Sequence, residues 1–412
     1  MVGRVQNCRA CGGGLTVTMA DLGLQPASNA FLASAEEVAD EQRFPLRAKV
    51  CDACRLVQVD YDVPPHELFG NYHYFSSYSD HWLEHAQRYC DMARARFGLG
   101  PDSLVVELAS NDGYLLKNFV SMGIPVLGID PSDTVAAAAQ KIGVPTLVEF
   151  FGLSLADTLA RRGQADLIIG NNVLAHVPQL NDFVAGISRL LKADGHVTIE
   201  FPHLLELIEH VQFDTIYHEH YSYISLLAIE QVFGRHGLRI YDVETLATHG
   251  GSLRIFAAHS HRSDLRDSRA LAQVRDREKA AGLGELSTYT RFAQRVEECR
   301  ASLLAFLAGA RRAAKSVAAY GAAAKGNTLL NFCEVTPADI TMVADRNPNK
   351  QAKLLPGTHI AVVSPEVLMR ARPDYVLILP WNLQTEIREQ LRGIEEWGGR
   401  FVTPVPVTRI DP

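Results

Sequence analysis

Residues 104–113 read Leu-Val-Val-Glu-Leu-Ala-Ser-Asn-Asp-Gly, and this stretch decides the fold of the middle of the chain. Its apolar first half predicts a buried strand, the polar residues predict a turn, and the apolar spacing over 114–122 predicts a helix. A second strand, 126–130, ends in an acid that lies 23 residues after Glu107. Strands that alternate with helices build a parallel sheet, so we predict an α/β fold with a Rossmann-like sheet whose carboxyl edge binds a ligand.

Two ligands compete for that edge, a dinucleotide and S-adenosylmethionine. A pyrophosphate requires several glycines so that the backbone can approach it, and the first turn contains only Gly113. The ammonium and ribose of S-adenosylmethionine instead require acids and amides, and the predicted strand 166–172 ends in two amides. The sequence therefore favours S-adenosylmethionine, held by Glu107, Asn111, Asp112, Gly113, Asp130, Asn171 and Asn172. The alternative is that Asn-Asp-Gly is an ordinary turn.

Four of the seven cysteines form two Cys-x-x-Cys pairs, Cys8 with Cys11 and Cys51 with Cys54. Four thiolates close the tetrahedral shell of zinc, which is typical of a structural site, whereas a catalytic zinc keeps one position open. The alternative is two unrelated pairs of buried or redox cysteines. We predict a structural zinc in a small module over residues 1–75, where the metal replaces the core that so short a segment lacks.

The composition bounds the class of protein. With 412 residues, of which 47% are apolar, the chain is expected to form two or three globular domains. The net charge of -7 and the pI near 6.1 argue against a nucleic-acid partner, because such proteins carry a surplus of Lys and Arg. No apolar run has the length of a signal peptide or a membrane span, so we predict a cytoplasmic protein without a membrane partner.

Residues 213–225 concentrate side chains that transfer protons. Six positions of this segment contain His218, Glu219, His220, Tyr221 and Tyr223. Histidine titrates near neutrality, and a neighbouring carboxylate can orient it or raise its basicity, which indicates general acid–base catalysis. A polar loop or a second metal site is the alternative. A strip at 71–78, rich in aromatic and hydroxyl groups, could line a sugar pocket or pack the junction between domains.

The C-terminal part repeats the pattern of strand, turn and helix. Residues 316–321 form a predicted strand that ends in a glycine, the following loop carries Lys325, and an apolar helix comes next. Later strands are predicted at 341–345, 375–379 and 400–403, which indicates a second open parallel sheet. A lysine at this end of the turn, beside helix N–H groups, suits a diphosphate.

The ordered set of motifs resembles one family over almost the whole chain. The set comprises the two Cys-x-x-Cys pairs, Tyr72-His-Tyr74, the Glu107 to Gly113 turn, Glu219-His220, His249-Gly-Gly251, Tyr320-Gly-Ala-Ala-Ala-Lys325 and Asn331-Phe-Cys333. The chain is similar to the zinc-containing, S-adenosylmethionine-dependent sugar C-methyltransferases, which methylate C3 of thymidine-diphosphate-linked 4-keto-deoxysugars. The ordered set is far more specific than any one of its members.

The resemblance implies roles for particular residues. His220 is expected to be the base that removes the proton beside the ketone, with Glu219 and Tyr72 or Tyr74 orienting it or stabilising the enolate. The C-terminal domain is expected to hold the nucleotide sugar. Its predicted contacts, together with those of the His249 turn, are His249, Gly250, Tyr320, Lys325, Asn327, Asn331, Lys350, Trp381 and Asn382.

On this basis we predict a zinc-binding module at 1–75, a class I methyltransferase domain at 76–258 and a Rossmann-like nucleotide-sugar domain at 259–412. The nearest alternative reaction is O- or N-methylation of the same class of sugar. A zinc-ribbon RNA methyltransferase is disfavoured by the acidic balance, and a nicotinamide-dependent oxidoreductase by the missing glycines after Gly321. The sequence leaves the oligomeric state open, and a monomer is compatible with it.

Overall fold

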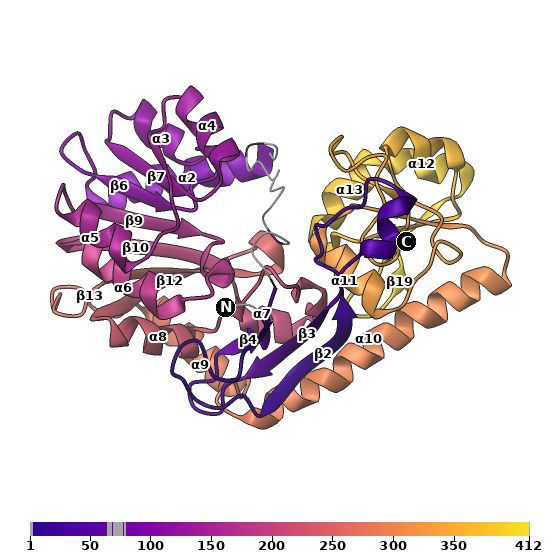
Figure 1. The fold of residues 1–412 in the computed structure, drawn as a ribbon, viewed down its shortest axis with the longest axis horizontal. Coiled ribbons are helices and arrows are strands. Elements are labelled where there is room, and N and C mark those ends of the chain that lie inside the picture. The colour runs from indigo at the N-terminus through magenta and orange to yellow at the C-terminus, as the bar shows by residue number, and fades with distance from the viewer. Residues whose placement is uncertain (1–2, 64–67, 69–76, 78–79, 412) are drawn as a thin grey trace.

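The structure is a computed structural model that describes residues 3–63, 68, 77 and 80–411. It has two lobes, and the N-terminal sheet and the long helix α10 (Leu286–Arg312) run beneath both of them (Figure 1). With a rise of about 1.5 Å per residue, the 27 residues of α10 extend over about 40 Å. The helix therefore reaches from one lobe to the other.

The first lobe is built on a seven-stranded sheet with the order β12-β13-β10-β9-β6-β7-β8. The pairings between β10, β9, β6, β7 and β8 are parallel, whereas β13 runs antiparallel to both of its neighbours. The strands are β6 (Val105–Leu108), β7 (Val126–Asp130), β8 (Thr146–Val148), β9 (Ala165–Asn171), β10 (Leu191–Pro202), β12 (Leu238–Leu246) and β13 (Ser252–His259). This is the parallel sheet that residues 104–130 predict.

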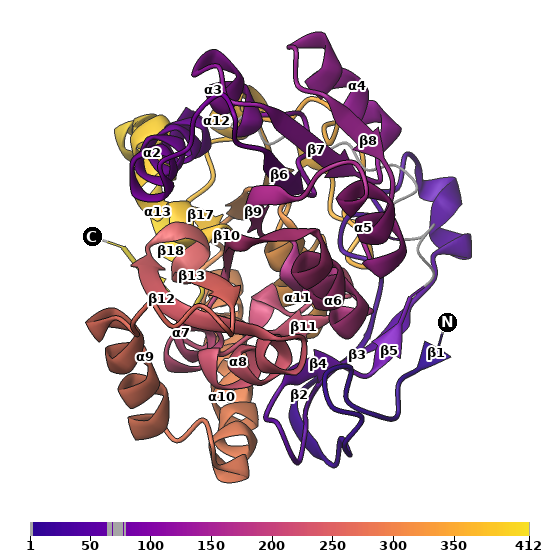
Figure 2. The same cartoon turned by 90° about the vertical axis from the view of Figure 1, so that its left-hand side faces the viewer.

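Helices cover both faces of this sheet, because successive strand residues point to opposite sides. Val105 packs into one hydrophobic cluster and Val106 into another. The Val105 side is covered by α2 (Asp80–Phe97), α3 (Leu116–Ser121) and α4 (Asp133–Lys141). The Val106 side is covered by α5 (Leu153–Ala160), α6 (Leu180–Leu190) and α8 (Leu226–Arg235). Figure 2 shows α2 and α5 on opposite sides of the strands.

The N-terminal module contributes a second, antiparallel sheet with the order β11-β4-β3-β2. Three of its strands come from the module itself, β2 (Val17–Gln25), β3 (Phe44–Val50) and β4 (Val57–Val59). The fourth, β11 (Ser222–Tyr223), belongs to the histidine-rich segment 213–225. The candidate catalytic segment is thus an edge strand of the N-terminal sheet.

The C-terminal lobe holds a six-stranded sheet with the order β16-β15-β14-β17-β18-β19. Its first five strands repeat the parallel order of the first lobe, with β14 in the place of β6, and β19 is antiparallel. The elements are β14 (Val317–Tyr320), α11 (Ala324–Phe332), β15 (Val343–Ala344), β16 (Val362–Val363), α12 (Pro365–Ala371), β17 (Tyr375–Ile378), α13 (Gln384–Gln390), β18 (Arg400–Thr403) and β19 (Arg409–Ile410). The predicted second Rossmann-like sheet is confirmed.

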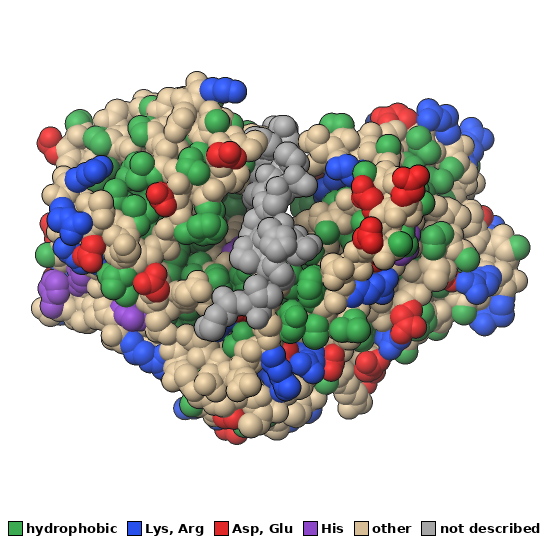
Figure 3. All heavy atoms as spheres, in the orientation of Figure 1, with side chains coloured by type: hydrophobic (Ala, Val, Ile, Leu, Met, Phe, Trp, Pro, Cys, Tyr) green, Lys and Arg blue, Asp and Glu red, His purple; other side chains and the backbone are tan. Residues whose placement is uncertain are grey.

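One hydrophobic core joins three parts of the molecule: the N-terminal sheet, α10 and the C-terminal sheet. Leu46 from β3, Leu303 from α10 and Leu377 from β17 are all fully buried in it. On the face drawn in Figure 3, basic and acidic side chains are intermixed over both lobes. Within the described ranges, every helix is too short or too polar to cross a lipid bilayer.

Candidate active site

The turn after β6 gathers three acids at the carboxyl edge of the first sheet. Asp130, at the end of β7, accepts hydrogen bonds from the backbone N–H groups of Asn111 and Ser132, both at 2.9 Å. Gly113 has a φ of +76°, and a Cβ at this position would lie 3.1 Å from Ala139 and Val144. Only glycine combines this backbone conformation with such close packing. The turn is therefore held tightly against β7 and α4.

Glu107 and its neighbours are suited to a cationic ligand. Burial raises the pKa of Glu107 well above its usual range, and the charges of Asp130 and Asp112 raise it further. One carboxylate oxygen of Glu107 and one of Asp112 are buried without a hydrogen-bond partner in the described part of the chain. A diphosphate would be repelled by three converging acids, whereas an ammonium, a sulfonium and ribose hydroxyls would satisfy them. The residues present therefore fit S-adenosylmethionine.

Two amides complete this edge at the end of β9. The side-chain oxygens of Asn171 and Asn172 are buried and have no partner among the described residues. Asn172 has a φ of 53°, in the left-handed region, and its side-chain N–H lies 3.0 Å from Nε2 of His249. Such strained positions are concentrated at functional sites. The structure therefore brings His249, a predicted substrate residue, to the predicted cofactor edge.

The four N-terminal thiols form one compact cluster, with all Sγ atoms within 4.8 Å of one another. The Sγ atoms of Cys8 and Cys54 lie 3.5 Å apart, and those of Cys11 and Cys51 lie 3.3 Å apart. Zinc–sulfur bonds of about 2.3 Å in a tetrahedron place sulfur atoms about 3.8 Å apart, so the cluster has the size that zinc requires. The four thiolates fill the tetrahedral shell and leave no position for water, which fits a structural ion.

His220 presents one defined ring nitrogen as a base. Its Nδ1 lies 3.0 Å from the carbonyl oxygen of Thr215, and a carbonyl only accepts, so Nδ1 carries the proton. Nε2 is then the acceptor, and the hydroxyl of Tyr217 donates to it at 2.9 Å. Removal from water lowers the pKa of His220 well below its usual range, and nearby His176 lowers it further. The ring is therefore neutral at physiological pH, as a general base must be.

The loop after β9 connects His220 with the cofactor edge. His176 follows Asn172 by four residues, and its ring contacts the ring of His220 edge-on at a centroid distance of 4.7 Å. The backbone N–H of Tyr221 donates to the carbonyl of Ala175 at 2.7 Å. The candidate catalytic segment is thus fastened to the loop that follows the strand with the two amides.

Glu219 lies next to His220 in sequence but faces a different part of the molecule. Asn29 of the N-terminal module donates its side-chain N–H to the Glu219 carboxylate at 2.6 Å. Burial raises the pKa of Glu219 to about 7, although Asn29 and the charge of Lys350 oppose this. Lys350 also donates to the carbonyl of Ala322, in the turn after β14. Glu219 therefore stands where the N-terminal module meets the ligand edge of the C-terminal sheet.

Several predicted substrate residues meet around Trp381. Lys325 donates to the side-chain oxygen of Asn382 at 2.7 Å and lies 4.5 Å from the Trp381 ring centroid. The indole N–H of Trp381 donates to Asp214 at 2.7 Å. A Cβ added to Gly250 would lie 2.5 Å from the far edge of the same indole. Trp381 therefore joins the C-terminal lobe to the first lobe.

Other predicted substrate residues lie in the C-terminal lobe. The amide of Asn327 is buried, and neither of its polar atoms has a partner among the described residues. Asn331 donates to the carbonyls of Asn327 and Pro356 and so supports a loop. The phenol of Tyr320 lies in the core with helix α13, where it donates to Gln390. Tyr72 and Tyr74 lie outside the described residues.

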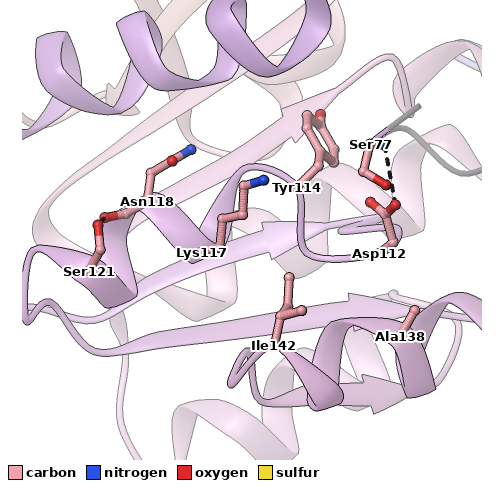
Figure 4. Close-up of a pocket in the computed structure, with 8 residues that line it drawn as sticks. All are labelled: Ser77, Asp112, Tyr114, Lys117, Asn118, Ser121, Ala138 and Ile142. Atoms are coloured by element: carbon pink, nitrogen blue, oxygen red, sulfur yellow. Dashed lines mark hydrogen bonds between the residues drawn. The ribbon is translucent and has the colours of Figure 1, made fainter. Parts of the chain in front are cut away.

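A surface cavity of about 520 Å³ lies beside the cofactor turn, lined by residues of α3 and α4. Figure 4 shows Asp112 in it, bonded to the backbone N–H of Ser77 at 3.2 Å. Asp112 is the one predicted cofactor residue that lines this cavity; the lining residues are Ser77, Asp112, Tyr114, Lys117, Asn118, Ser121, Ala138 and Ile142. The cavity flanks the site and does not contain its main polar groups.

Sequence reasoning missed His176, Asp214 and the role of Tyr217. A polar residue shortly after a predicted sheet strand was the available signal for His176. Tyr217 and Asp214 lie inside the segment 213–225, but only the fold shows that a one-turn spacing brings the Tyr217 hydroxyl to His220. The buried carboxylate of Glu200, which binds His85 and Arg254 at 2.9 and 2.6 Å, was also missed.

Comparisons with known proteins cover nearly all of the chain. Three family models match successive parts: a domain described as zinc-binding over 8–69, a methyltransferase domain over 82–243 and a C-methyltransferase C-terminal domain over 247–406. The C-methyltransferase NovU of Streptomyces niveus is 36% identical over 407 residues, which are 98% of this chain and 97% of the relative.

Two more distant matches concern the methyltransferase part. The ubiquinone biosynthesis O-methyltransferase of Rhodopseudomonas palustris is 26% identical over 117 residues, which are 26% of this chain and 46% of the relative. A crystal structure of magnesium protoporphyrin IX methyltransferase from Synechocystis, with S-adenosylmethionine bound, has a TM-score of 0.34 and 19% identity. This alignment covers 44% of the present chain and 82% of the other.

The match to NovU covers 98% of this chain, and the family models begin at Cys8 of the thiol cluster and end at Pro406. Together, the relative and the family models confirm the resemblance predicted from the motifs and the class of reaction, and the model over 8–69 confirms the zinc-binding nature of the thiol cluster. The chain belongs to the C-methyltransferase family, as an enzyme that uses S-adenosylmethionine and carries zinc in its N-terminal module.

Proposed function

We propose that this enzyme methylates the carbon beside the ketone, C3, of a nucleotide-linked 4-keto-deoxysugar, with thymidine diphosphate as the nucleotide and His220 as the base. The observation that carries the proposal is the fixed tautomer of His220, whose Nε2 is the acceptor because Nδ1 donates to Thr215. A carbon beside a ketone is a weak acid, so its methylation requires such a base. Transfer to a hydroxyl or an amine requires less help.

The proposed reaction uses the cofactor edge of the first sheet and the ligand edge of the C-terminal sheet, with His220 between them. The Tyr217 hydroxyl turns its hydrogen away from Nε2 of His220. That nitrogen then takes the proton from the carbon, and the bonding electrons pass to the ketone oxygen to form an enolate. Bound S-adenosylmethionine supplies an electrophilic methyl group. Glu107, Asp112, Asp130, Asn171 and Asn172 would hold its ammonium and ribose. In the transfer, the enolate carbon would form the new bond to the methyl carbon as the sulfur–methyl bond breaks, the ketone would be restored, and neutral S-adenosylhomocysteine would leave.

The C-terminal sheet would bind the nucleotide. Asp345 directly follows β15 and accepts from the N–H of Ala322 at 2.8 Å, as Asp130 does from Asn111 in the first sheet. The buried amide of Asn327 has polar atoms available for a ligand. Glu219 would bind or orient the sugar, together with Tyr72 or Tyr74. We also place the enzyme in the cytoplasm, because a reducing compartment keeps zinc-binding thiols reduced.

The deciding experiment follows the carbon-bound hydrogen. The enzyme is incubated with thymidine-diphosphate-linked 4-keto-deoxysugars in deuterium oxide without a methyl donor, and then with it. We expect deuterium at the carbon beside the ketone, and a product heavier by one CH₂ whose new methyl is bonded to carbon by NMR. His220→Asn should abolish the exchange while the affinity for S-adenosylmethionine stays nearly unchanged. A methyl found on oxygen or nitrogen, or equal loss of exchange and of cofactor affinity, would contradict the proposal.

A further inference from the structure

The indole of Trp381 spans two segments that carry histidines of the site. At its five-membered ring, the N–H donates to Asp214 at 2.7 Å, one residue before Thr215, which holds His220. At its six-membered ring, it touches Gly250, which follows His249. The indole therefore lies between the turn that bears His220 and the turn that bears His249.

Lys325 lies over the face of this indole, at 4.5 Å from the ring centroid. Its helix, α11, is fixed to the catalytic segment one turn further on, where Thr328 donates its hydroxyl to the carbonyl of Ile216 at 3.2 Å. An ammonium has three N–H donors, and Asn382 takes one of them at 2.7 Å. The ammonium is thus held in one place, and since Asn382 is its one hydrogen-bond acceptor among the described residues, it keeps donors for a ligand.

The electrostatic environment agrees with this position. The positive charge of Lys325 contributes to lowering the pKa of both His220 and His249. Burial lowers the pKa of Lys325 itself, and the carboxylate of Asp214 opposes that shift. A protonated His220 would repel Lys325, whose charge already lowers the pKa of His220, unless a negative charge develops between them. Proton transfer to His220 is therefore favoured when an anion forms at the same moment.

We propose that Lys325 donates a hydrogen bond to the ketone oxygen and stabilises the enolate, so that it is a catalytic residue and not a ligand of the diphosphate. This rests on the proposed function. In the step, the C–H bond breaks, its proton goes to Nε2 of His220, and the electron pair forms the carbon–carbon double bond as the oxygen becomes negative. The Lys325 ammonium and the developing oxyanion attract each other most strongly in the transition state.

The proposal revises the expectation from the sequence, in which Lys325 lies at the phosphate end of the turn. The side chain does not extend from the N-terminus of α11 toward open space, because Asn382 and Trp381 hold its ammonium. The two roles differ in kinetics. A diphosphate ligand affects substrate binding, whereas an enolate partner affects the rate at saturating substrate.

The test compares Lys325→Met, which removes the charge at similar length, with Lys325→Arg, which keeps it. Exchange of the carbon-bound hydrogen for deuterium is measured without methyl donor at saturating sugar nucleotide. The dissociation constants of thymidine diphosphate and S-adenosylmethionine are measured by calorimetry. We expect Lys325→Met to reduce the exchange rate by about 100-fold or more, since one oxyanion donor contributes about that much. Both dissociation constants should stay within about threefold, and Lys325→Arg should retain more exchange than Lys325→Met.

The pH profile provides a readout that a structural role would not change. Removing the Lys325 charge raises the pKa of His220, so the acidic limb of the exchange rate should move to higher pH in Lys325→Met and stay in place in Lys325→Arg. The groups that face His220 and remain are His176, His249, Tyr217 and Tyr223.

An exchange rate in Lys325→Met within about threefold of wild type would overturn the inference. So would a loss of thymidine diphosphate affinity above about tenfold with an unchanged rate at saturation, because that result assigns Lys325 to the diphosphate. If Lys325→Met does not fold, Lys325→Arg decides. A shift of its acidic limb would overturn the inference, because the positive charge is retained in this variant. Failure of the proposed function would look different, since the wild-type enzyme itself would then exchange no hydrogen.

Discussion

The buried carboxylate of Glu278 makes a strong prediction about stability. This residue of α9 (Arg269–Ala280) accepts from the backbone N–H groups of Leu226 and Leu227, at 2.6 and 2.8 Å, and from Nε2 of His203 at 2.7 Å. It therefore caps the first turn of α8, directly after the catalytic segment. Glu278→Ala leaves three buried donors without a partner.

The size of the loss follows from these contacts. Hydrogen bonds to a carboxylate contribute about 1.5–3 kcal/mol each. Contributions within one cluster are not additive, so we expect Glu278→Ala to lose about 3–5 kcal/mol in total. Glu230, on α8, provides a matched control at the same helix pair. It binds Arg275 of α9 at 2.6 Å, but both side chains are partly exposed. Surface pairs of this kind contribute about 0–1 kcal/mol.

Urea unfolding followed by circular dichroism measures both variants, and hydrogen–deuterium exchange mass spectrometry locates the effect. We expect Glu278→Ala to unfold at clearly lower urea and to lose protection in residues 226–235, while Glu230→Ala stays close to wild type. Equal losses in the two variants would refute the reasoning, because burial would then make no difference. A protected α8 in Glu278→Ala would refute the assignment of Glu278 as its cap.

Three further predictions concern activity. The pKa of Glu219 is about 7, whereas that of His220 lies well below its usual value. The exchange rate should therefore show an inflection near pH 7 in the wild type and none in Glu219→Gln. An inflection that persists in Glu219→Gln would exclude Glu219 as its source. Cys54→Ser should lose zinc by mass spectrometry and most of the exchange activity while retaining affinity for S-adenosylmethionine; full activity without zinc would show that the module does not position His220. Gly250 has a φ of +88°, and a Cβ at this position would lie 2.5 Å from Trp381. Gly250→Ala should therefore lower the free energy of unfolding by about 1–3 kcal/mol and reduce the rate. Gly234→Ala, whose Cβ would meet no atom within 4 Å, should do neither.

Patterns of consecutive residues predicted those parts of the fold and of the candidate site that depend on neighbouring residues alone. The strand before the Asn-Asp-Gly turn, the acid that ends β7 and the thiol pairs each depend on a few consecutive residues, and all were placed correctly. The predicted cofactor residues meet because the carboxyl ends of neighbouring parallel strands share one edge. Predicting the sheet was therefore enough to predict that Glu107, Asp130 and Asn171 converge.

Side-chain direction and long-range pairing could not be predicted in the same way. Val317 and Ala319 face one core and Ala318 and Tyr320 face the other, so the strand period directs Tyr320 away from the junction between the lobes. The sequence motif alone does not specify this alternation relative to neighbouring helices. Pairing of β11 with β4 joins residues more than 160 positions apart, and no local pattern indicates it.

This pairing also explains why an enzyme with two Rossmann-like sheets carries a zinc module. The segment with His220 has contacts to three separate parts of the chain. Val59 of β4 donates to the carbonyl of Tyr221 at 3.1 Å, Tyr221 donates to Ala175 in the loop after β9, and Thr328 of α11 donates to Ile216. A segment without its own core can hold a base in one orientation only if its surroundings fix it. The zinc fixes the turn that leads into β4, and β4 pairs with β11. If His220 is the base, as proposed, the orientation of its Nε2 depends on this chain of contacts, and we expect the metal to contribute to catalysis without approaching the substrate.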